Sequence, residues 1–448
     1  MKMIRFSIAG CTVLLLMGVA YAQLATTTAL VGTVTDTSGQ TVPGTKITAV
    51  NQGTGDTYNA TTNDQGYYNI QFVHVGTYNL SVEKSGFQKV EKTGVIVENN
   101  QTVRNDIILA VGSLSQSVTI AAEAPVLKTD DASISENITT REVNELPLNG
   151  RDAMRLALTT PTVIQGLKAS NGVPPGEDFI GAGTREIQNE MSLDGISIMN
   201  NLITTTPSRP MVEAVQEVQI QTGTYSAQYG AYMGVHINMI TKSGTNALHG
   251  SVLEFVRNDV FDGRPYFLPA TQHKPPLRQN QFGFELDGPI VIPKLYNGRN
   301  RTFFMGSYEG LRQIRETTSL ATIMTPQMFT GDFSQFTAKQ IVNPATGQTF
   351  TGNIIPPSQL SQYTVQLQKY YPKPNLPGIT NNYSAVLPNN VNTDQTVDRL
   401  DQNLGDKTRL FFRYQRQQET ILVGAVNPTS ATNGPVYLSN YDIGYTQT

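Results

Sequence analysis

The chain contains 448 residues, which is enough for two or three domains of ordinary size. Hydrophobic residues make up 39% and charged residues 15%, and 38 glycines and 24 prolines interrupt the sequence. This composition favours many short strands over long helices. The net charge of -3 provides no basic surface for nucleic acid. These values argue against a helical bundle, a nucleic-acid-binding protein and a disulfide scaffold.

The sequence offers no recognisable motif for catalysis, metal binding or cofactor binding. Cys11 is the only cysteine, so a cysteine metal site or redox pair is excluded. The four histidines are His74, His236, His249 and His273. No two of them have the spacing of zinc ligands on one helix. Gly181 and Gly183 begin like a dinucleotide fingerprint, but Glu186 occupies the third glycine position. We therefore expect no catalytic residue, no cofactor and no metal, and predict that the protein is not an enzyme.

Residues 1–22 are predicted to form a cleaved secretory signal peptide. Lys2 and Arg5 give a positive head, residues 6–20 are apolar, and residues 20–22 have the small-x-small form of a cleavage site. The apolar run is shorter than the about 20 residues that a transmembrane helix needs. A lipoprotein box ending at Cys11 is disfavoured because most of the apolar region follows it. Removal of the signal peptide leaves a mature chain without cysteine, which suits an exported bacterial protein.

Residues 28–112 are predicted to form a small β-sandwich. Turn residues recur about every 8–12 positions, as in all-β domains. Between the turns, polar and apolar side chains alternate, and in residues 77–83 the side chains of Tyr78, Leu80 and Val82 share one face. A period of two gives a strand one buried and one wet face. We expect these three side chains to line a core.

The same segment resembles a carboxypeptidase regulatory-like domain. The resemblance is carried by Gly32-Thr-Val-Thr-Asp36, Gly39, Val42-Pro-Gly44, Thr62-Asn-Asp-Gln-Gly-Tyr67, Gly76-Thr-Tyr-Asn-Leu80 and Gly86-Phe87. It implies a transthyretin-like sandwich that sits beside another domain, and it does not imply catalysis. Asp36, Asp64 and Tyr67 are accordingly interpreted as structural residues.

Residues 113–245 are predicted to form an α+β domain of short helices and strands. Thr139 or Thr140 can cap a short helix that Pro147 ends, and Asp152 can cap a second short helix. Strands are expected at residues 191–195, 215–220 and 235–240. Asp194, in an Asp-Gly turn, is interpreted as a turn aspartate bonded to its own backbone.

This order of elements resembles the plug of TonB-dependent outer-membrane receptors, and most closely the Oar-like group, in which a regulatory-like sandwich precedes the plug. The resemblance is carried by Glu145-Leu-Pro-Leu-Asn-Gly-Arg151, Leu193-Asp-Gly195, Val215-Gln-Glu-Val218, Thr224-Tyr-Ser-Ala-Gln-Tyr-Gly230 and Ile240-Thr-Lys-Ser-Gly-Thr-Asn246. Tyr232 and Met233 depart from the small, glycine-rich residues that are usual there, which we interpret as local packing variation. A cluster of tyrosines is interpreted as packing between plug and barrel: Tyr225, Tyr229 and Tyr232.

Residues 246–448 are predicted to be part of an outer-membrane β-barrel with long outside loops. Phe282, Phe284 and Leu286 share one strand face, and further on Phe412 and Tyr414 alternate with Arg413 and Gln415. Alternating strands of this kind occur in barrels, but also in a soluble sandwich with a polar outer face. The preceding plug favours the barrel. The long connection is expected to run from residue 313 to residue 396, in keeping with the long outside loops of such barrels.

The barrel segment is expected to hold about six strands of about ten residues each. A plugged outer-membrane transporter has about 22 strands, and open strand edges cannot sit in lipid. The predicted fold class is therefore mainly β: a transthyretin-like sandwich, a plug, and the first strands of an incomplete outer-membrane barrel. We expect the chain to be the N-terminal part of a longer protein.

The resemblance implies a receptor in the outer membrane of a Gram-negative bacterium, in contact with outer-membrane lipid. Such a receptor binds an extracellular ligand and imports it with energy from the TonB complex of the inner membrane. The sequence does not specify the class of ligand, which can be a siderophore, a glycan or other carbohydrate, a peptide or a protein. The alternative is a surface-binding or adhesion protein with the same parts and no import. An exported enzyme is a third and weaker alternative, since no catalytic constellation supports it.

A TonB-contacting strand is expected in the linker between sandwich and plug, where related receptors carry it. Its predicted residues are Ser115, Gln116, Ser117, Val118, Thr119 and Ile120. The segment is short and β-prone, so it can add as an edge strand to a partner sheet through backbone N–H groups. The alternative is a passive linker strand.

Overall fold

A computed structural model describes residues 28–447, apart from residues 114–116, 122–132, 147, 149, 167–178, 201–205, 207–208, 226–228, 231, 265–273, 338, 369–370, 406–407 and 427–435. The predicted signal peptide lies outside the described residues. Two compact units make up the chain: one comprises the residues up to His249 together with 286–306 and 397–413, and the other comprises the remainder. The structure is mainly β, as the sequence predicts. No helix among the described residues is long and apolar enough to span a membrane.

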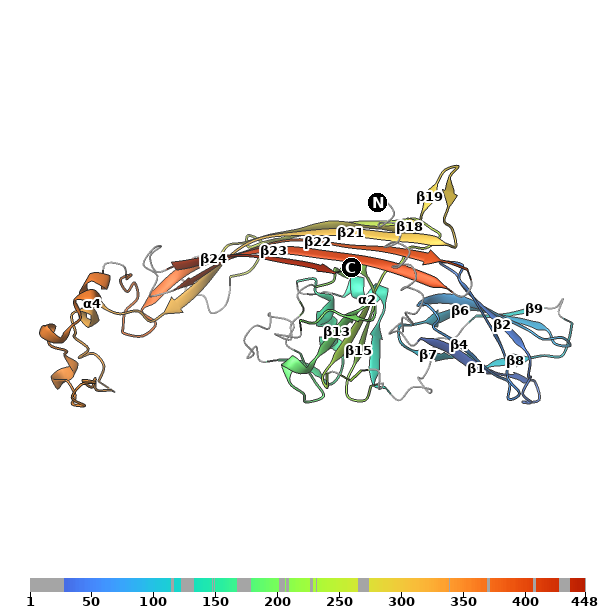
Figure 1. The fold of residues 1–448 in the computed structure, drawn as a ribbon, viewed down its shortest axis with the longest axis horizontal. Helices are drawn as coiled ribbons and strands as arrows, with labels where there is room; N and C mark the ends of the chain where they lie inside the picture. The colour runs from blue at the N-terminus through green and yellow to red at the C-terminus, as the bar shows by residue number, and fades with distance from the viewer. Residues whose placement is uncertain are drawn as a thin grey trace, which may run out of the picture. The chain divides into compact units, whose positions relative to one another are not determined.

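Two sheets form the N-terminal sandwich (Figure 1). One has the order β3-β2-β5-β6-β9, and in the other β1 pairs with β4, β7 and β8. The strands are β1 (Ala29–Asp36), β2 (Lys46–Asn51), β3 (Thr57–Thr61), β4 (Tyr67–Gln71), β5 (Gly76–Glu83), β6 (Lys89–Val97), β7 (Thr102–Arg104), β8 (Ile107–Leu109) and β9 (Ser117–Ala121).

The alternation predicted for residues 77–83 is confirmed in β5. Tyr78, Leu80 and Val82 are buried in one core cluster with residues of both sheets. Each fully buried side chain of this size contributes about 1.5–3 kcal/mol of hydrophobic stabilisation. Gly39 and Gly66 have positive φ in turns between strands, a conformation that glycine adopts without steric cost. The first 80 residues of the described chain therefore carry a core of their own.

The predicted plug contains a sheet of order β10-β15-β16-β13-β14 and a separate β11–β12 hairpin. Its elements are β10 (Ser135–Ile138), α2 (Thr140–Glu145), the 3-10 helix η2 (Ala153–Thr159), β11 (Val163–Gln165), β12 (Phe179–Gly181), η3 (Glu186–Gln188), β13 (Glu190–Leu193), β14 (Ile196–Ser197), η4 (Val212–Ala214), β15 (Val215–Gln221) and β16 (His236–Thr241). Both short helices predicted from capping residues are present.

Capping explains where these two helices begin. The Glu142 carboxylate accepts the backbone N–H of Thr139, 2.9 Å away, and Asp152 accepts the N–H of Met154 at 3.0 Å. These bonds satisfy donors that the first turn of a helix leaves free. Val143 and Met154 are buried, so each helix turns one apolar side into the plug core.

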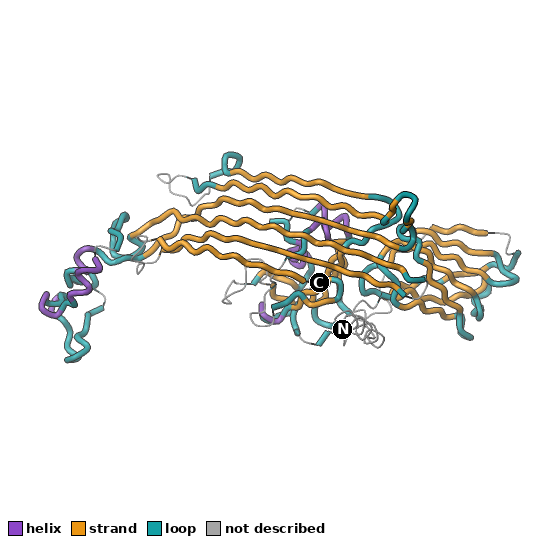
Figure 2. Tube along the Cα trace, turned by 45° about the horizontal axis from the view of Figure 1, so that its top comes forward, coloured by secondary structure: helices purple, strands orange, loops and turns teal. Residues whose placement is uncertain are grey.

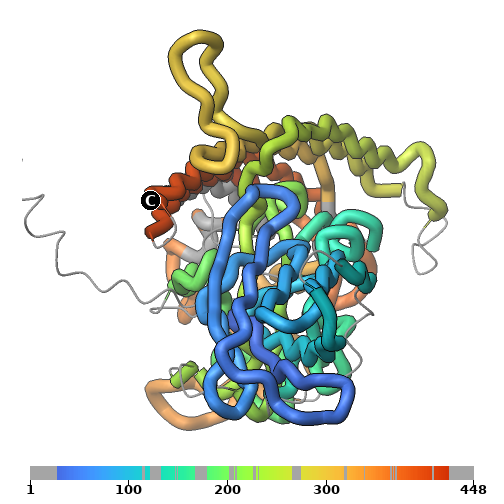
Figure 3. The backbone as a smooth tube through the Cα atoms, turned by 90° about the vertical axis from the view of Figure 1, so that its right-hand side faces the viewer, coloured from blue at the N-terminus to red at the C-terminus, as the bar shows by residue number. Residues whose placement is uncertain are grey.

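Six long strands follow, in the sheet order β17-β18-β21-β22-β23-β24, and run side by side (Figure 2). They are β17 (His249–Asn258), β18 (Leu277–Pro289), β21 (Thr302–Ala321), β22 (Tyr383–Asn403), β23 (Arg409–Val426) and β24 (Val436–Gln447). A small hairpin of β19 (Val291–Ile292) and β20 (Tyr296–Asn297) projects between β18 and β21 (Figure 3). The described part of this region thus contains the expected number of long strands.

The predicted limits of the long connection were wrong. Residues 313–321 continue β21 and residues 383–396 belong to β22, so the connection covers residues 322–382. It contains α3 (Pro326–Phe329), η5 (Thr351–Asn353), η6 (Pro357–Gln359) and α4 (Gln362–Leu367). The strands on either side have 20 and 21 residues, longer than the about 9–11 that cross a membrane. The polar ends of these strands have the composition of a loop, so the sequence does not mark where each strand stops.

The faces of these strands have the polarity opposite to that of a soluble sandwich. In β18, Phe284 and Leu286 are exposed while Gln281 and Glu285 are buried. In β23, Phe412 is exposed, whereas Arg413 and Gln415 are buried. An apolar outer face with a polar inner face is typical of strands that border lipid. The sandwich alternative left open by alternation is therefore disfavoured.

Candidate functional site

A buried carboxylate in the plug joins two arginines from the long strands. Asp194 occupies the turn between β13 and β14, with φ of 51°. Its carboxylate lies 3.1 Å from Nη1 of Arg399 in β22 and 2.9 Å from Nε of Arg413 in β23. The side chains of Asp194 and Arg413 are 4% and 3% exposed. We refer to Asp194, Arg399 and Arg413 as the plug anchor.

Hydrogen bonds to β16 fix the position of Asp194 in this turn. Its backbone N–H donates to Met239 of β16, and its carboxylate accepts the N–H of Thr241 at 2.9 Å. Asp194 is thus a turn residue, but the prediction that its carboxylate bonds its own backbone was wrong. The carboxylate instead binds the next strand of the plug and the two arginines. Removing one partner of a buried ion pair costs about 3–5 kcal/mol, because the other charge is left uncompensated.

Other contacts reinforce the plug anchor. Arg399 also pairs with Asp401 at 2.8 Å and stacks over the ring of Phe411 at 4.7 Å. Apolar packing beside it joins plug and strands in one small buried cluster: Met211, Ala214, Met305 and Val397. The Arg399–Asp401 pair fixes the guanidinium that faces the plug. The anchor therefore combines charge pairing with packing.

The plug also binds the sandwich through polar groups. Oε2 of Glu217 in β15 accepts the backbone N–H of Asn99 at 2.7 Å, and Nε2 of Gln219 donates to the Asn99 carbonyl at 2.9 Å. Asn100 donates to Oε1 of Gln219 at 3.1 Å and to the hydroxyl of Tyr229 at 3.0 Å. Burial raises the pKa of Glu217 to about 7. The hydrogen bond from Asn99 lowers this pKa, and the negative charge of Glu98 raises it further. This interface therefore contains a carboxyl group that titrates near neutral pH.

The tyrosine cluster packs inside the plug and against the sandwich. Tyr225 and Tyr229 both contact the ring of His236, with centroids 4.3 and 5.0 Å apart. Tyr225 donates to the carbonyl of Tyr232. These contacts lie within the plug and with Asn100 of the sandwich. The expected packing of the cluster between plug and barrel stays a prediction.

The predicted TonB-contacting residues fall at an edge of the sandwich. Ser115 and Gln116 lie outside the described residues, while Ser117, Val118, Thr119 and Ile120 belong to β9. All residues of β9 are exposed. β9 pairs in parallel with β6, with Val118 opposite Val90. Its other edge pairs with none of the strands that the structure describes.

Sequence reasoning missed both partners of Asp194 and the Glu217–Asn99 contact. Asp194 stands in a segment that carries the resemblance to the plug, but nothing in the sequence pairs it with Arg399 or Arg413. Among the described residues, no group of three or more His, Cys, Asp or Glu side chains is placed to hold a metal ion.

Comparison with known proteins identifies two domains. Residues 240–448 match the outer membrane beta barrel domain, and residues 29–110 match the carboxypeptidase regulatory-like domain. The TonB-dependent transporter Oar of Myxococcus xanthus is 26% identical over 315 residues, which cover 67% of this chain and 28% of that protein. The chain therefore spans less than a third of the length of this relative.

Solved structures that align with part of this chain include the outer membrane transporter YddB from Escherichia coli, at 11% identity and a TM-score of 0.39, covering 66% of this chain and 34% of that chain. A variant of the ferric enterobactin receptor PfeA from Pseudomonas aeruginosa has 14% identity and a TM-score of 0.34, covering 66% and 33%. From the domain matches and the Oar relative, this chain is an Oar-like homologue of TonB-dependent transporters, with a carboxypeptidase regulatory-like domain and an outer membrane beta-barrel domain.

Proposed function

We propose that the protein is a TonB-dependent outer-membrane receptor that binds an extracellular ligand and imports it with energy from the inner membrane. The observation that carries the proposal is the plug anchor, in which Asp194 holds the plug against Arg399 and Arg413 of strands with an apolar outer face. A plug fastened by a few buried ion pairs is stable at rest. It is released only when those pairs are broken together.

Energy coupling is assigned to β9, which offers an exposed strand edge to a TonB partner. An extended partner segment can add to such an edge through backbone hydrogen bonds. Support comes from the five exposed residues of β9 and from its outer edge, which no described strand occupies. The competing role for β9 is a passive linker strand that only completes the sandwich sheet.

Two proline variants test this assignment. Successive N–H groups of a strand point to opposite edges, so Val118→Pro and Thr119→Pro remove donors from opposite edges of β9. One of the two variants therefore loses an N–H donor on the outer edge, where the TonB strand would add. That variant should bind the purified periplasmic domain of TonB at least about tenfold more weakly than the wild type. Val118→Ala keeps the donor and serves as the control. Binding unchanged in both proline variants would place the coupling strand elsewhere.

The alternative function is surface binding or adhesion without import. It shares the outer-membrane barrel and the plug but has no need of TonB. This alternative would be favoured if the wild-type protein is folded in outer membranes but does not bind the TonB domain.

A further inference from the structure

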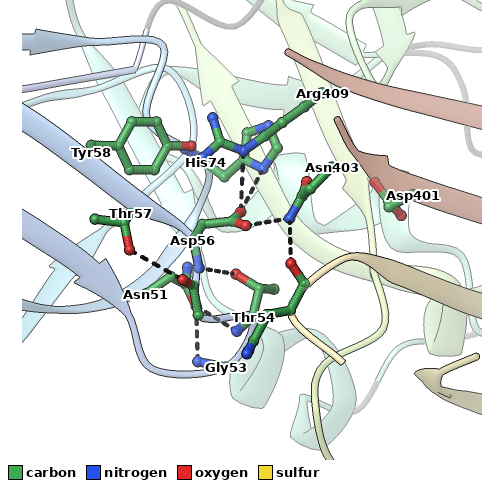
Figure 4. Close-up of polar contacts among 12 residues, drawn as sticks. Asn51, Gly53, Thr54, Asp56, Thr57, Tyr58, His74, Asp401, Asn403 and Arg409 are labelled. Atoms are coloured by element: carbon green, nitrogen blue, oxygen red, sulfur yellow. Dashed lines mark hydrogen bonds and ion pairs between the residues drawn. The ribbon is translucent and has the colours of Figure 1, made fainter. Parts of the chain in front are cut away.

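The turn between β2 and β3 of the sandwich is built as a rigid polar element. The side-chain oxygen of Asn51 accepts the backbone N–H groups of Gly53 at 2.8 Å and Thr54 at 3.1 Å. The N–H of Asn51 donates to the carbonyl of Asp56 at 2.8 Å, which closes the turn (Figure 4). The turn therefore holds the Asp56 carboxylate in one position.

Asp56 is buried among cationic and amide groups from distant parts of the chain. Its side chain is 4% exposed, and its Oδ2 lies 3.4 Å from Nε of Arg409 and 3.6 Å from Nδ1 of His74. Asn403 donates to Oδ1 through its side-chain amide (Figure 4). Arg409 also lies over the ring of Tyr58, with the guanidinium carbon 4.3 Å from the ring centroid. Arg409 and Asn403 come from β23 and β22, so the sandwich carboxylate is satisfied largely by the ends of the long strands.

A second set of contacts beside Asp56 involves the backbone of the same turn. The carbonyl of Gly53 accepts the N–H of Asn246 at 2.9 Å. Asn246 and Asn300 exchange two hydrogen bonds, at 2.6 and 2.7 Å. Asn403 donates its backbone N–H to the carbonyl of Arg301 at 2.7 Å. Three chain segments that are far apart in sequence are thereby tied together where the sandwich turn meets them.

We infer that residues 51–57 are a docking element and that their partner is a rim of the same chain, made of Asn246, Asn300, Arg301, Asn403 and Arg409. The rim holds the sandwich independently of the plug. The contact between the docking element and the rim includes a buried ion pair, a cation–π contact and backbone hydrogen bonds. The described polar contacts between the sandwich and the plug lie elsewhere, at Asn99 and Asn100. The inference holds whether or not the protein imports a ligand.

Cross-linking between introduced cysteines tests directly whether the docking element lies against the rim. A Cβ built on Gly53 lies 3.7 Å from Cβ of Thr245, within the about 3.5–4.5 Å that a disulfide requires. The Gly53→Cys and Thr245→Cys pair is introduced in the full chain with Cys11→Ser, which removes the only native cysteine. Gly39→Cys with Thr245→Cys is the matched control, because a Cβ at Gly39 has no atom within 4 Å. Mild oxidation in membranes should cross-link the first pair and leave the control pair reduced.

Two further variants separate the rim from the plug. Arg409→Glu opposes Asp56 without altering the sandwich itself, and should slow cross-linking about tenfold or more. Gln219→Ala, in β15 of the plug, removes hydrogen bonds to Asn99 and Asn100 of the sandwich and none to the rim, so it should leave the cross-linking rate unchanged. Gel mobility with and without heating reports whether the strands stay folded in both variants. Equal cross-linking in the control pair, an unchanged rate in Arg409→Glu, or an equal loss in Gln219→Ala would overturn the inference.

Discussion

Oδ2 of Asp194 in the plug and Nε of Arg413 in β23 lie 2.9 Å apart, and both side chains are almost completely buried. The contact crosses from a plug turn to a strand of the six-stranded sheet. Arg399 approaches the same carboxylate from the neighbouring strand β22. One buried carboxylate therefore pairs with two guanidinium groups, one of which also pairs with Asp401, so the plug cannot leave without breaking both of its ion pairs with Asp194.

The first prediction concerns Asp194→Asn. The amide keeps the shape of the side chain but removes the charge, and should destabilise the folded protein by about 3–5 kcal/mol, because two buried arginines lose their shared partner. Thermal unfolding with limited proteolysis of the plug measures the effect. Asp106→Asn is the control, since its pair with Arg104 is exposed and should contribute at most about 1 kcal/mol. Equal losses in both variants would contradict a special role for the anchor.

The second prediction is a pH dependence at the contact of sandwich and plug. The pKa of Glu217 is raised from 4.5 to about 7 in the folded protein, first by burial and then by the charge of Glu98. A raised folded pKa stabilises the protonated form, so this contribution is complete below about pH 4.5 and is lost as the pH rises through about 7. The shift corresponds to about 3 kcal/mol. Melting temperature measured from pH 5 to pH 8 should fall with rising pH.

Glu217→Gln provides the matched variant for that measurement. The amide oxygen can still accept the N–H of Asn99, but it does not titrate. The variant should therefore be more stable than the parent at pH 8 and should lose this part of the pH dependence. A pH profile that is identical in parent and variant would assign the dependence to another group.

The third prediction follows from the apolar outer face of β18. Phe284 is 50% exposed, and an arginine on the lipid side of a barrel strand costs about 2–4 kcal/mol near the membrane midplane. Phe284→Arg should therefore lower the amount of heat-modifiable protein in outer-membrane fractions. Ser85→Arg adds the same charge to an exposed turn of the sandwich and should have no effect. Normal membrane levels of Phe284→Arg would mean that this face does not contact lipid.

The fourth prediction is that residues 28–112 fold alone as a soluble monomer. The core cluster of the sandwich is drawn from residues 30–109, and β9 adds only exposed residues to the sheet. Amide spectra of fragments 28–112 and 28–121 should both be well dispersed, and the longer fragment should show slower hydrogen exchange in β6, where β9 pairs. Poor dispersion in both fragments would show that the sandwich needs the plug.

Local patterns predicted much of the fold and little of the site. Alternation in β5 and capping at Thr139 and Asp152 depend on neighbouring residues, and these elements appear where expected. The partners of Asp194 and Asp56 depend on which charged side chains the tertiary fold brings together. That information is spread over more than 200 residues, and no periodicity encodes it. The limits of the long connection failed for a related reason, because polar strand ends have the composition of loops.

The parallel pairing of β9 with β6 has a mechanical consequence. Residues 117–121 run in the same direction as residues 89–93. A force along β9 loads the hydrogen bonds between the two strands together, whereas a force across the sheet breaks them one after another. A partner strand joined to the outer edge of β9 and pulled along its length would therefore transmit load to the whole sandwich before β9 separates. The direction of the force, as well as its magnitude, therefore decides whether the sandwich moves as one body or β9 separates from β6.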